Sequence, residues 1–182
     1  MSKKISFGLS IKEVQGAIKE LQSYRDDLNK KCEELCRRLT EEGIQIASGI
    51  IGNNELGRFI RLGSEITPEQ AGCKAILYMS DSSRIRSEWK TLDGVKSSEI
   101  SPTLMLAFGS GQKAENPLNI PGVGTGTFPG GTHGNESEWY YMDLDGVWHR
   151  SSGIAPKMPM YRTAEKMREI LQMIANEIFR SI

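Results

Sequence analysis

The sequence predicts an α+β fold in which a long N-terminal helix and a C-terminal helix pack on a small, mostly antiparallel sheet with a long Gly/Pro-rich loop. Three observations predict it: an apolar heptad pattern near the N-terminus, apolar runs of strand length in the middle, and a second helical pattern at the end. The 182 residues show no internal repeat and no linker, so we expect a single domain over residues 1–182.

The first helix is expected from about residue 11 to about residue 50. Ser10 and Glu13 form the S-x-x-E signature of a capping box, which places the helix start directly after Ser10. Apolar side chains then follow spacings of three and four residues, as in a coiled-coil seam, except that Arg25 and Glu42 occupy two of the seam positions. They are Val14, Ile18, Leu21, Leu28, Cys32, Leu35, Leu39 and Ile46.

This helix is long for the size of the chain. At about 1.5 Å per residue it would measure about 60 Å, and one small domain cannot cover its whole apolar stripe. Gly43 is expected to weaken its later part. We therefore expect the seam around Leu21, Leu28 and Leu35 to pack on the sheet or on a neighbouring subunit.

The sheet is expected between about residues 73 and 150. The runs CKAILYM (73–79) and TLMLAFGSG (103–111) are apolar and typical of strands, and the second ends in a glycine turn. The polar stretch 81–101 between them predicts a loop or a poor strand. Residues 109–134 form the long loop, which is rich in glycine and proline, and such loops are usually functional or disordered.

Two aromatic runs in EWYYMDLDGVWHR (138–150) flank Asp145-Gly146 and indicate a hairpin. Alternation places Trp139 and Tyr141 on one face of the first strand. That face would serve either as a cross-strand ladder in the core or as a subunit interface, where Trp and Tyr are enriched.

The C-terminal helix is expected from about Thr163, a plausible N-cap, to Phe179. Its apolar residues recur at helical spacing and define one buried face. They are Ala164, Met167, Ile170, Leu171, Ile174, Ala175 and Ile178.

Bulk composition excludes several functional classes. Hydrophobic residues are 38% and charged residues 25%, and the formal net charge is zero, without the Lys/Arg excess of a basic nucleic-acid binder. No apolar run reaches the roughly 20 residues of a membrane helix, and the N-terminus does not resemble a secretory signal. We expect a cytoplasmic protein without membrane contact.

No pattern predicts a catalytic, cofactor or metal site. GVGTGT (122–127) is followed by Phe-Pro-Gly-Gly, which cannot begin the helix that a phosphate loop needs. His133 and His149 lack a neighbouring nucleophile motif. The three cysteines, Cys32, Cys36 and Cys73, share no ligand spacing with those histidines, so we expect reduced thiols and no zinc.

Several segments, in their order along the chain, resemble one protein family. They are FGLSIKEVQGAIKELQSY (7–24), LTEEGIQIA (39–47), the strand end Phe108-Gly109-Ser110-Gly111, WYYMDLDGVWHRSSG (139–153) and APKMPMYRTAEKM (155–167). Together they are similar to the tail-completion or head–tail joining (neck) proteins of long-tailed phages and prophages. The resemblance covers both ends and the third quarter of the chain.

The resemblance implies a structural virion protein of the tail or neck, assembled in the host bacterial cytoplasm and without catalytic residues. Copies would form a ring, expected to be a hexamer, between the head connector or head-completion protein and the tail terminator or tail tube protein. DNA would pass through the lumen without specific binding. The predicted interface residues are Leu21, Leu28, Leu35, Phe108, Gly109, Gly111, Trp139, Tyr141, Pro159 and Tyr161.

Three alternatives remain open from the sequence. A tail-terminator ring that caps the tail tube would have the same kind of fold, and the sequence does not separate the two because both are ring-forming adaptors. A small hydrolase would use the Gly-rich loop as a lid and His133 or His149 as a base. A stand-alone coiled-coil interaction protein would dimerise through residues 1–50 alone.

Overall fold

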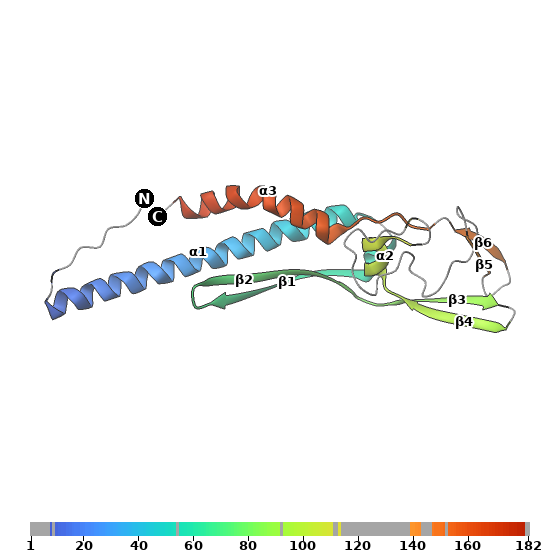
Figure 1. Ribbon diagram of the computed structural model, residues 1–182, viewed down its shortest axis with the longest axis horizontal. Helices are drawn as coiled ribbons and strands as arrows, with labels where there is room; N and C mark the ends of the chain where they lie inside the picture. Colours follow the sequence, from blue (N-terminus) through green and yellow to red (C-terminus); the bar gives the residue numbers. More distant parts are fainter. Residues whose placement is uncertain are drawn as a thin grey trace. The chain divides into compact units, whose positions relative to one another are not determined.

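The computed structural model confirms the α+β class. It describes residues 8, 10–53, 55–91, 93–110, 113, 139–142, 147–151 and 153–180. In chain order the elements are α1 (Ile11–Ile51), η1 (Glu55–Phe59), β1 (Ile60–Glu69), β2 (Gly72–Asp81), β3 (Ile85–Thr91), β4 (Gly94–Ile100), α2 (Pro102–Phe108), β5 (Trp139–Met142), β6 (Trp148–Ser151) and α3 (Pro159–Phe179) (Figure 1).

The chain divides into two compact units, which we describe separately. The first contains residues 1–45, 64–77 and 165–182, and the second contains residues 46–63 and 78–164. Helices α1 and α3 and strands β1 and β2 contribute residues to both.

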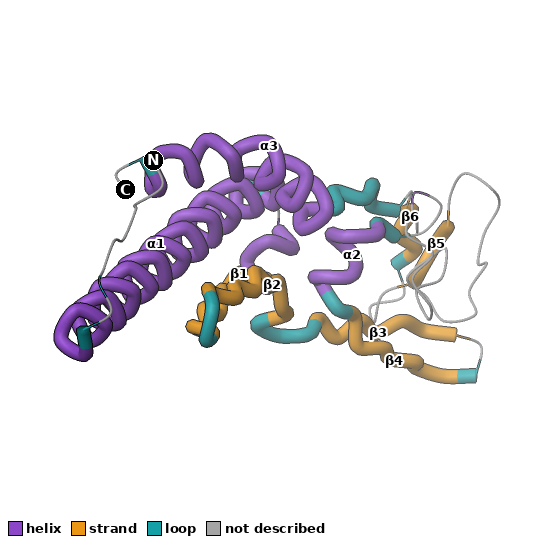
Figure 2. Tube along the Cα trace, turned by 60° about the vertical axis from the view of Figure 1, so that its left-hand side comes forward, coloured by secondary structure: helices purple, strands orange, loops and turns teal. Residues whose placement is uncertain are grey.

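Within the described residues the strands form three separate two-stranded sheets, β1–β2, β3–β4 and β5–β6, rather than one continuous sheet (Figure 2). Strands β3 and β4 pair antiparallel from Ile85↔Ile100 to Thr91↔Gly94. Strands β5 and β6 also pair antiparallel, which confirms the predicted hairpin, and Trp139 lies opposite Ser151. The turn between them, residues 143–146, lies outside the described residues.

In the first unit, helix α1 packs against both α3 and the β1–β2 hairpin, which Figures 1 and 2 both show alongside its later part. The close approach occurs at Gly43, where an added Cβ would lie 2.8 Å from both Leu77 Cδ2 and Met167 Sδ. Arg38 of α1 also forms a 2.7 Å ion pair with Glu177 of α3. Gly43 was predicted only to weaken the helix, and in the structure it is the position that lets two neighbours approach.

The buried face of α1 in this unit therefore differs from the predicted heptad seam. Thr40 and Gly43 are buried, whereas Leu28 and Leu35 of the seam are only half-buried. The Thr40 hydroxyl donates to backbone carbonyls of its own helix, at 2.9 Å from Cys36 O, so its burial leaves no unpaired group. The heptad marks an apolar stripe, but small residues beside it make the tightest packing.

In the second unit the expected strand 103–111 is wrong, because Pro102–Phe108 forms helix α2. The Ser101 side chain accepts a hydrogen bond from Leu104 N, and Pro102 occupies the first helical turn, where proline needs no backbone donor. Leu106 is fully buried, and α2 packs against η1. An apolar run without clear periodicity is compatible with either a strand or a helix, and here the N-cap at Ser101 favours the helix.

Two further boundaries differ from expectation. The polar stretch 81–101, expected as a loop or poor strand, forms the β3–β4 hairpin. Helix α3 begins at Pro159 instead of Thr163, and Thr163 is fully buried inside it with no hydrogen bond from its hydroxyl oxygen. Proline is favoured in a first helical turn, so Pro159 begins the helix and Thr163 does not cap it.

The predicted buried face of α3 is partly confirmed. Ile174 is buried and Met167 is half-buried, but Ala164 and Leu171 are exposed. Of the loop 109–134, only Gly109, Ser110 and Lys113 belong to the described residues.

Candidate functional site

The most conspicuous surface feature of the described residues is the apolar stripe along the first part of α1. We name it the distal seam and define it as Ile11, Val14, Ile18, Leu21 and Tyr24; Val14 is half-buried, and Ala17 beside it is buried. Ile11 is 79%, Ile18 49% and Leu21 53% exposed, whereas such side chains are normally buried. An exposed apolar stripe of this length is typical of a protein-binding surface.

The start of the seam is fixed by the predicted capping box. Glu13 N donates to Ser10 Oγ at 3.3 Å, and Ser10 N donates to a Glu13 carboxylate oxygen at 3.3 Å. The first helical hydrogen bond, from Val14 N to Ser10 O at 3.0 Å, follows directly. Local chemistry thus begins the helix here.

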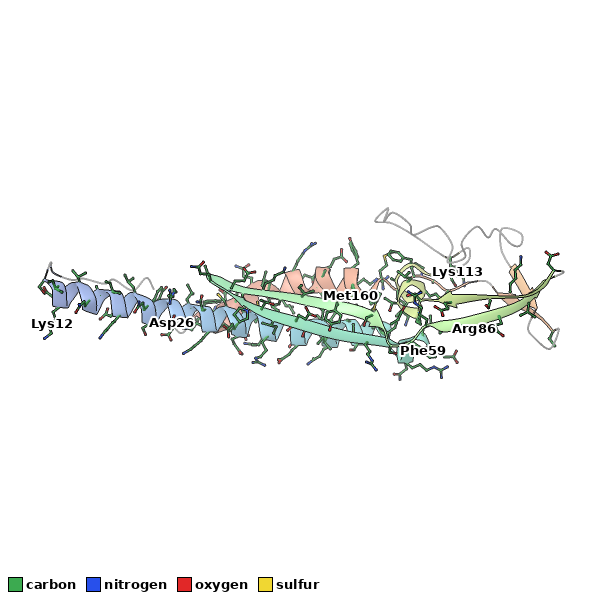
Figure 3. All side chains as sticks on the ribbon, turned by 90° about the horizontal axis from the view of Figure 1, so that it is seen from below. Lys12, Asp26, Phe59, Arg86, Lys113 and Met160 are labelled. Carbon is green, nitrogen blue, oxygen red and sulfur yellow. The ribbon has the colours of Figure 1, made fainter. Side chains whose placement is uncertain are left out.

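Within the first unit, the seam extends past the elements that pack on the later part of α1. Figure 3 shows Lys12 near the start of the helix and Asp26 close to the tip of the β1–β2 hairpin. Figure 3 shows no described helix or strand alongside α1 between these two residues, although Ala17 within this stretch is buried. The seam predicted around Leu21 therefore lies at the surface, and Leu28 and Leu35, farther along, are half-buried.

A second feature lies in the other unit, where the end of α2 meets the segment before α3. Ser110 N donates to Ile154 O at 2.9 Å, and Ile154 N donates to Ser110 O at 3.2 Å. Lys157 N also donates to Leu106 O at 2.9 Å. We call these paired segments, 106–110 and 153–158, the clasp.

Gly109 is essential to the geometry of the clasp. Its φ of 77° is unfavourable for other residues, and a Cβ at this position would collide with the carbonyl oxygen of Ile154. The same segment holds the end of α1, because Lys157 Nζ donates to Ile51 O at 2.8 Å. A positive charge at a helix C-terminus also interacts favourably with the helix dipole.

The clasp brings together two of the segments that carried the family resemblance, although they are far apart in the sequence. Of the predicted interface residues there, Gly109 and Pro159 are buried and Phe108 is half-buried. Tyr161 is exposed. Gly111 lies outside the described residues, and for Trp139 and Tyr141 only the backbone of β5 is described.

The structure adds a charged residue that the sequence reasoning missed. Asp81, at the end of β2, accepts a hydrogen bond from Thr103 N in the first turn of α2 at 2.9 Å. Burial of the carboxyl works to raise its pKa, but hydrogen bonds from Thr103 and Ser101 and the charge of Arg84 outweigh it and lower the pKa of Asp81. No local sequence signal links Asp81 to α2.

The three cysteines, Cys32, Cys36 and Cys73, are half-buried free thiols. Cys36 of α1 lies against β2, with its Sγ 3.6 Å from Cys73 O. Burial, a hydrogen bond with Cys73 and the neighbouring thiols raise the pKa of Cys36 to about 11, so it is a protonated and weakly nucleophilic thiol at neutral pH. Among the described residues, no three His, Cys, Asp or Glu side chains lie close enough together to hold a metal ion.

None of the helices in the described part of the chain combines the length and apolar character needed to cross a membrane. In comparisons with known proteins, no family model, no curated protein and no solved structure matches the chain.

Proposed function

We propose that this chain is a structural virion protein of the phage neck, and that copies of it form a ring joining the tail to the DNA-filled head. One observation supports the proposal: four apolar residues at heptad spacing, Ile11, Val14, Ile18 and Leu21, lie along the first part of α1, where Figure 3 shows no described helix or strand, and all but Val14 are exposed. A protein that works only in an assembly has reason to keep such a surface, since a neighbouring copy covers it.

The clasp supports the same proposal. Two segments that resemble neck proteins, one around Phe108-Gly109 and one from Gly153 to Tyr161, are joined by backbone hydrogen bonds. Their resemblance therefore concerns one structural element instead of two unrelated stretches. We expect the buried residues Gly109 and Pro159 to stabilise the clasp, and the exposed Tyr161 to contact a neighbouring copy.

The proposed partners follow from a position between head and tail. On one side the ring would contact the head connector or head-completion protein, and on the other the tail terminator or tail tube protein. DNA would pass through the lumen without specific binding, which is compatible with a formal net charge of zero because strong phosphate binding would hinder passage. The proposal requires no catalytic residue or cofactor.

The test is electron microscopy of particles from an infection or induction with and without the gene. We expect unjoined filled heads and complete tails when the protein is missing, and restoration by the wild-type chain. Gold or antibody labelling of the restored particles should place the protein at the head–tail junction.

Two outcomes would contradict the proposal in different ways. Tails of abnormal length together with label at the tail end would indicate a tail-terminator ring. Normal particles without the protein would refute a virion role altogether, and would direct attention to an enzymatic function.

A further inference from the structure

Three thiols lie together in the first unit, where helix α1 faces the start of strand β2. Cys32 and Cys36 are one turn apart on α1, and Cys73 is the second residue of β2. The Cys36 Sγ lies 3.6 Å from the carbonyl oxygen of Cys73, and the thiols of Cys73 and Cys32 both interact with the Cys36 thiol. All three are half-buried, so they remain partly open to solvent.

The two neighbours of Cys36 differ in how well they could form a disulfide with it. A disulfide needs two Cβ atoms about 3.5–4.5 Å apart. Residues one turn apart on a helix have Cβ atoms about 5–6 Å apart, so a bond between Cys32 and Cys36 would distort α1. Cys73 belongs to a different element, and its backbone already contacts the Cys36 sulfur. The geometry therefore favours the pair Cys36 and Cys73.

The backbone before Cys73 has room to adjust to such a bond. Cys73 comes directly after the turn of the β1–β2 hairpin, and Gly72 in front of it has a φ of 129°. A Cβ on Gly72 would meet open space, so this turn is not tightly packed. A small movement of the hairpin end can therefore bring Cys73 into disulfide geometry without disturbing α1.

We propose that Cys36 and Cys73 form a disulfide when the protein meets a peroxide, and that this bond fastens helix α1 to the β1–β2 hairpin. In the first step the Cys73 thiolate attacks one oxygen of hydrogen peroxide, releases hydroxide and becomes a sulfenic acid. In the second step the Cys36 sulfur attacks the Cys73 sulfur, loses its proton and displaces water. Two thiols and one peroxide thus give one disulfide and two water molecules.

The order of the two steps follows from the surroundings of Cys36. Its pKa is raised to about 11, so it is protonated at neutral pH, and a protonated thiol is a weak nucleophile. Oxidation is therefore expected to begin at Cys73 and to be slow at neutral pH. The inference does not depend on the proposed neck role; under that role, the bond would form once particles leave the reducing host cytoplasm.

The experiment compares reduced and peroxide-treated full-length protein. After treatment with hydrogen peroxide, the remaining thiols are blocked with iodoacetamide, and trypsin then releases residues 32–37 and 62–74. We expect mass spectrometry to find these two peptides linked, and a non-reducing gel to show that the chain is still monomeric. The oxidised protein should have a Tm roughly 10 °C above that of the reduced protein, because the bond closes a long loop of the unfolded chain. Dithiothreitol should reverse both changes.

Three serine substitutions identify the pair. Cys32→Ser is the matched control and should keep the linked peptides and the rise in Tm, because Cys32 takes no part in the bond. Cys36→Ser and Cys73→Ser should each lose both. The comparison of oxidised with reduced wild-type protein needs no variant, so the test still decides if one of the substitutions prevents folding.

Three results would overturn the inference: a link between Cys32 and Cys36, a link between two chains, or three thiols that all still react with iodoacetamide after peroxide treatment. Each of these results can coexist with a protein located at the neck in particles. Conversely, a bond between Cys36 and Cys73 in a protein absent from particles would refute the neck proposal and keep the disulfide.

Discussion

The three glycines inside α1 give a direct test of how this helix is packed. Gly16 and Gly49 have open space where a Cβ would lie, whereas a Cβ on Gly43 would be 2.8 Å from Leu77 Cδ2 and from Met167 Sδ. Replacement of each by alanine makes the same chemical change in one helix. The difference between the three variants therefore measures the packing at Gly43.

The expected magnitudes can be worked from these contacts. Alanine is favoured over glycine inside a helix by about 1 kcal/mol, so Gly49→Ala should raise the free energy of unfolding by about that amount. At Gly43 the same gain is opposed by overpacking, which costs about 1–3 kcal/mol. Both crowded atoms are ends of flexible side chains, so we expect a cost of about 2 kcal/mol and a net loss of about 1 kcal/mol.

Urea denaturation followed by circular dichroism measures both values. The two variants should differ by about 2 kcal/mol, which corresponds to roughly 4–8 °C in Tm for a chain of this size. In a Met167→Ala background, one of the two clashes is removed, and Gly43→Ala should become less harmful by about 1 kcal/mol. If Gly43→Ala stabilises the protein as much as Gly49→Ala does, the close approach of α1, β2 and α3 described above is incorrect.

Three further substitutions test the second unit, all by denaturation. Lys157→Met removes the hydrogen bond to the end of α1 and should cost about 1–2 kcal/mol, whereas Lys166→Met on the exposed face of α3 should have almost no effect. Asp81→Asn should cost about 1 kcal/mol at neutral pH. Because the folded-state pKa of Asp81 is lowered, its stabilisation is complete above the ordinary Asp pKa of about 3.9 and is lost as the pH falls through the folded value, so variant and wild type should converge in acid. Gly109→Ala combines a φ of 77° with a collision with the Ile154 carbonyl, and should cost about 3 kcal/mol or more; a mild effect would contradict the clasp geometry.

The parts of the fold that the sequence predicted are those controlled by local chemistry. The helix start after Ser10 follows from a capping box formed three residues apart, and the β5–β6 hairpin follows from two aromatic runs and a short turn. The β2 strand likewise follows from a continuous apolar run. In each case the decisive interactions join residues that are close in the chain.

The errors arose where distant residues or competing local signals decide. The run 103–108 is apolar on both faces of a strand, so its hydrophobicity pattern alone favoured a strand. The helix depends instead on the cap formed by Ser101 and Pro102, which a hydrophobicity pattern does not detect. The buried face of α1 depends on Leu77 and Met167, so Gly43 could be recognised as a packing position only in three dimensions. The same holds for the contact between Lys157 and Ile51.

The clasp has a consequence for how this protein tolerates change in length. Ser110 and Ile154 form two backbone hydrogen bonds with each other, so the ends of the chain segment between them are held together. The entropic cost of bringing the two ends of such a segment together grows only with the logarithm of the segment's length, so doubling the length costs about 0.6 kcal/mol. Insertions between these two residues, including a fluorescent or affinity tag, should therefore leave the two joined segments in place, and related chains could differ greatly in length here at little thermodynamic cost.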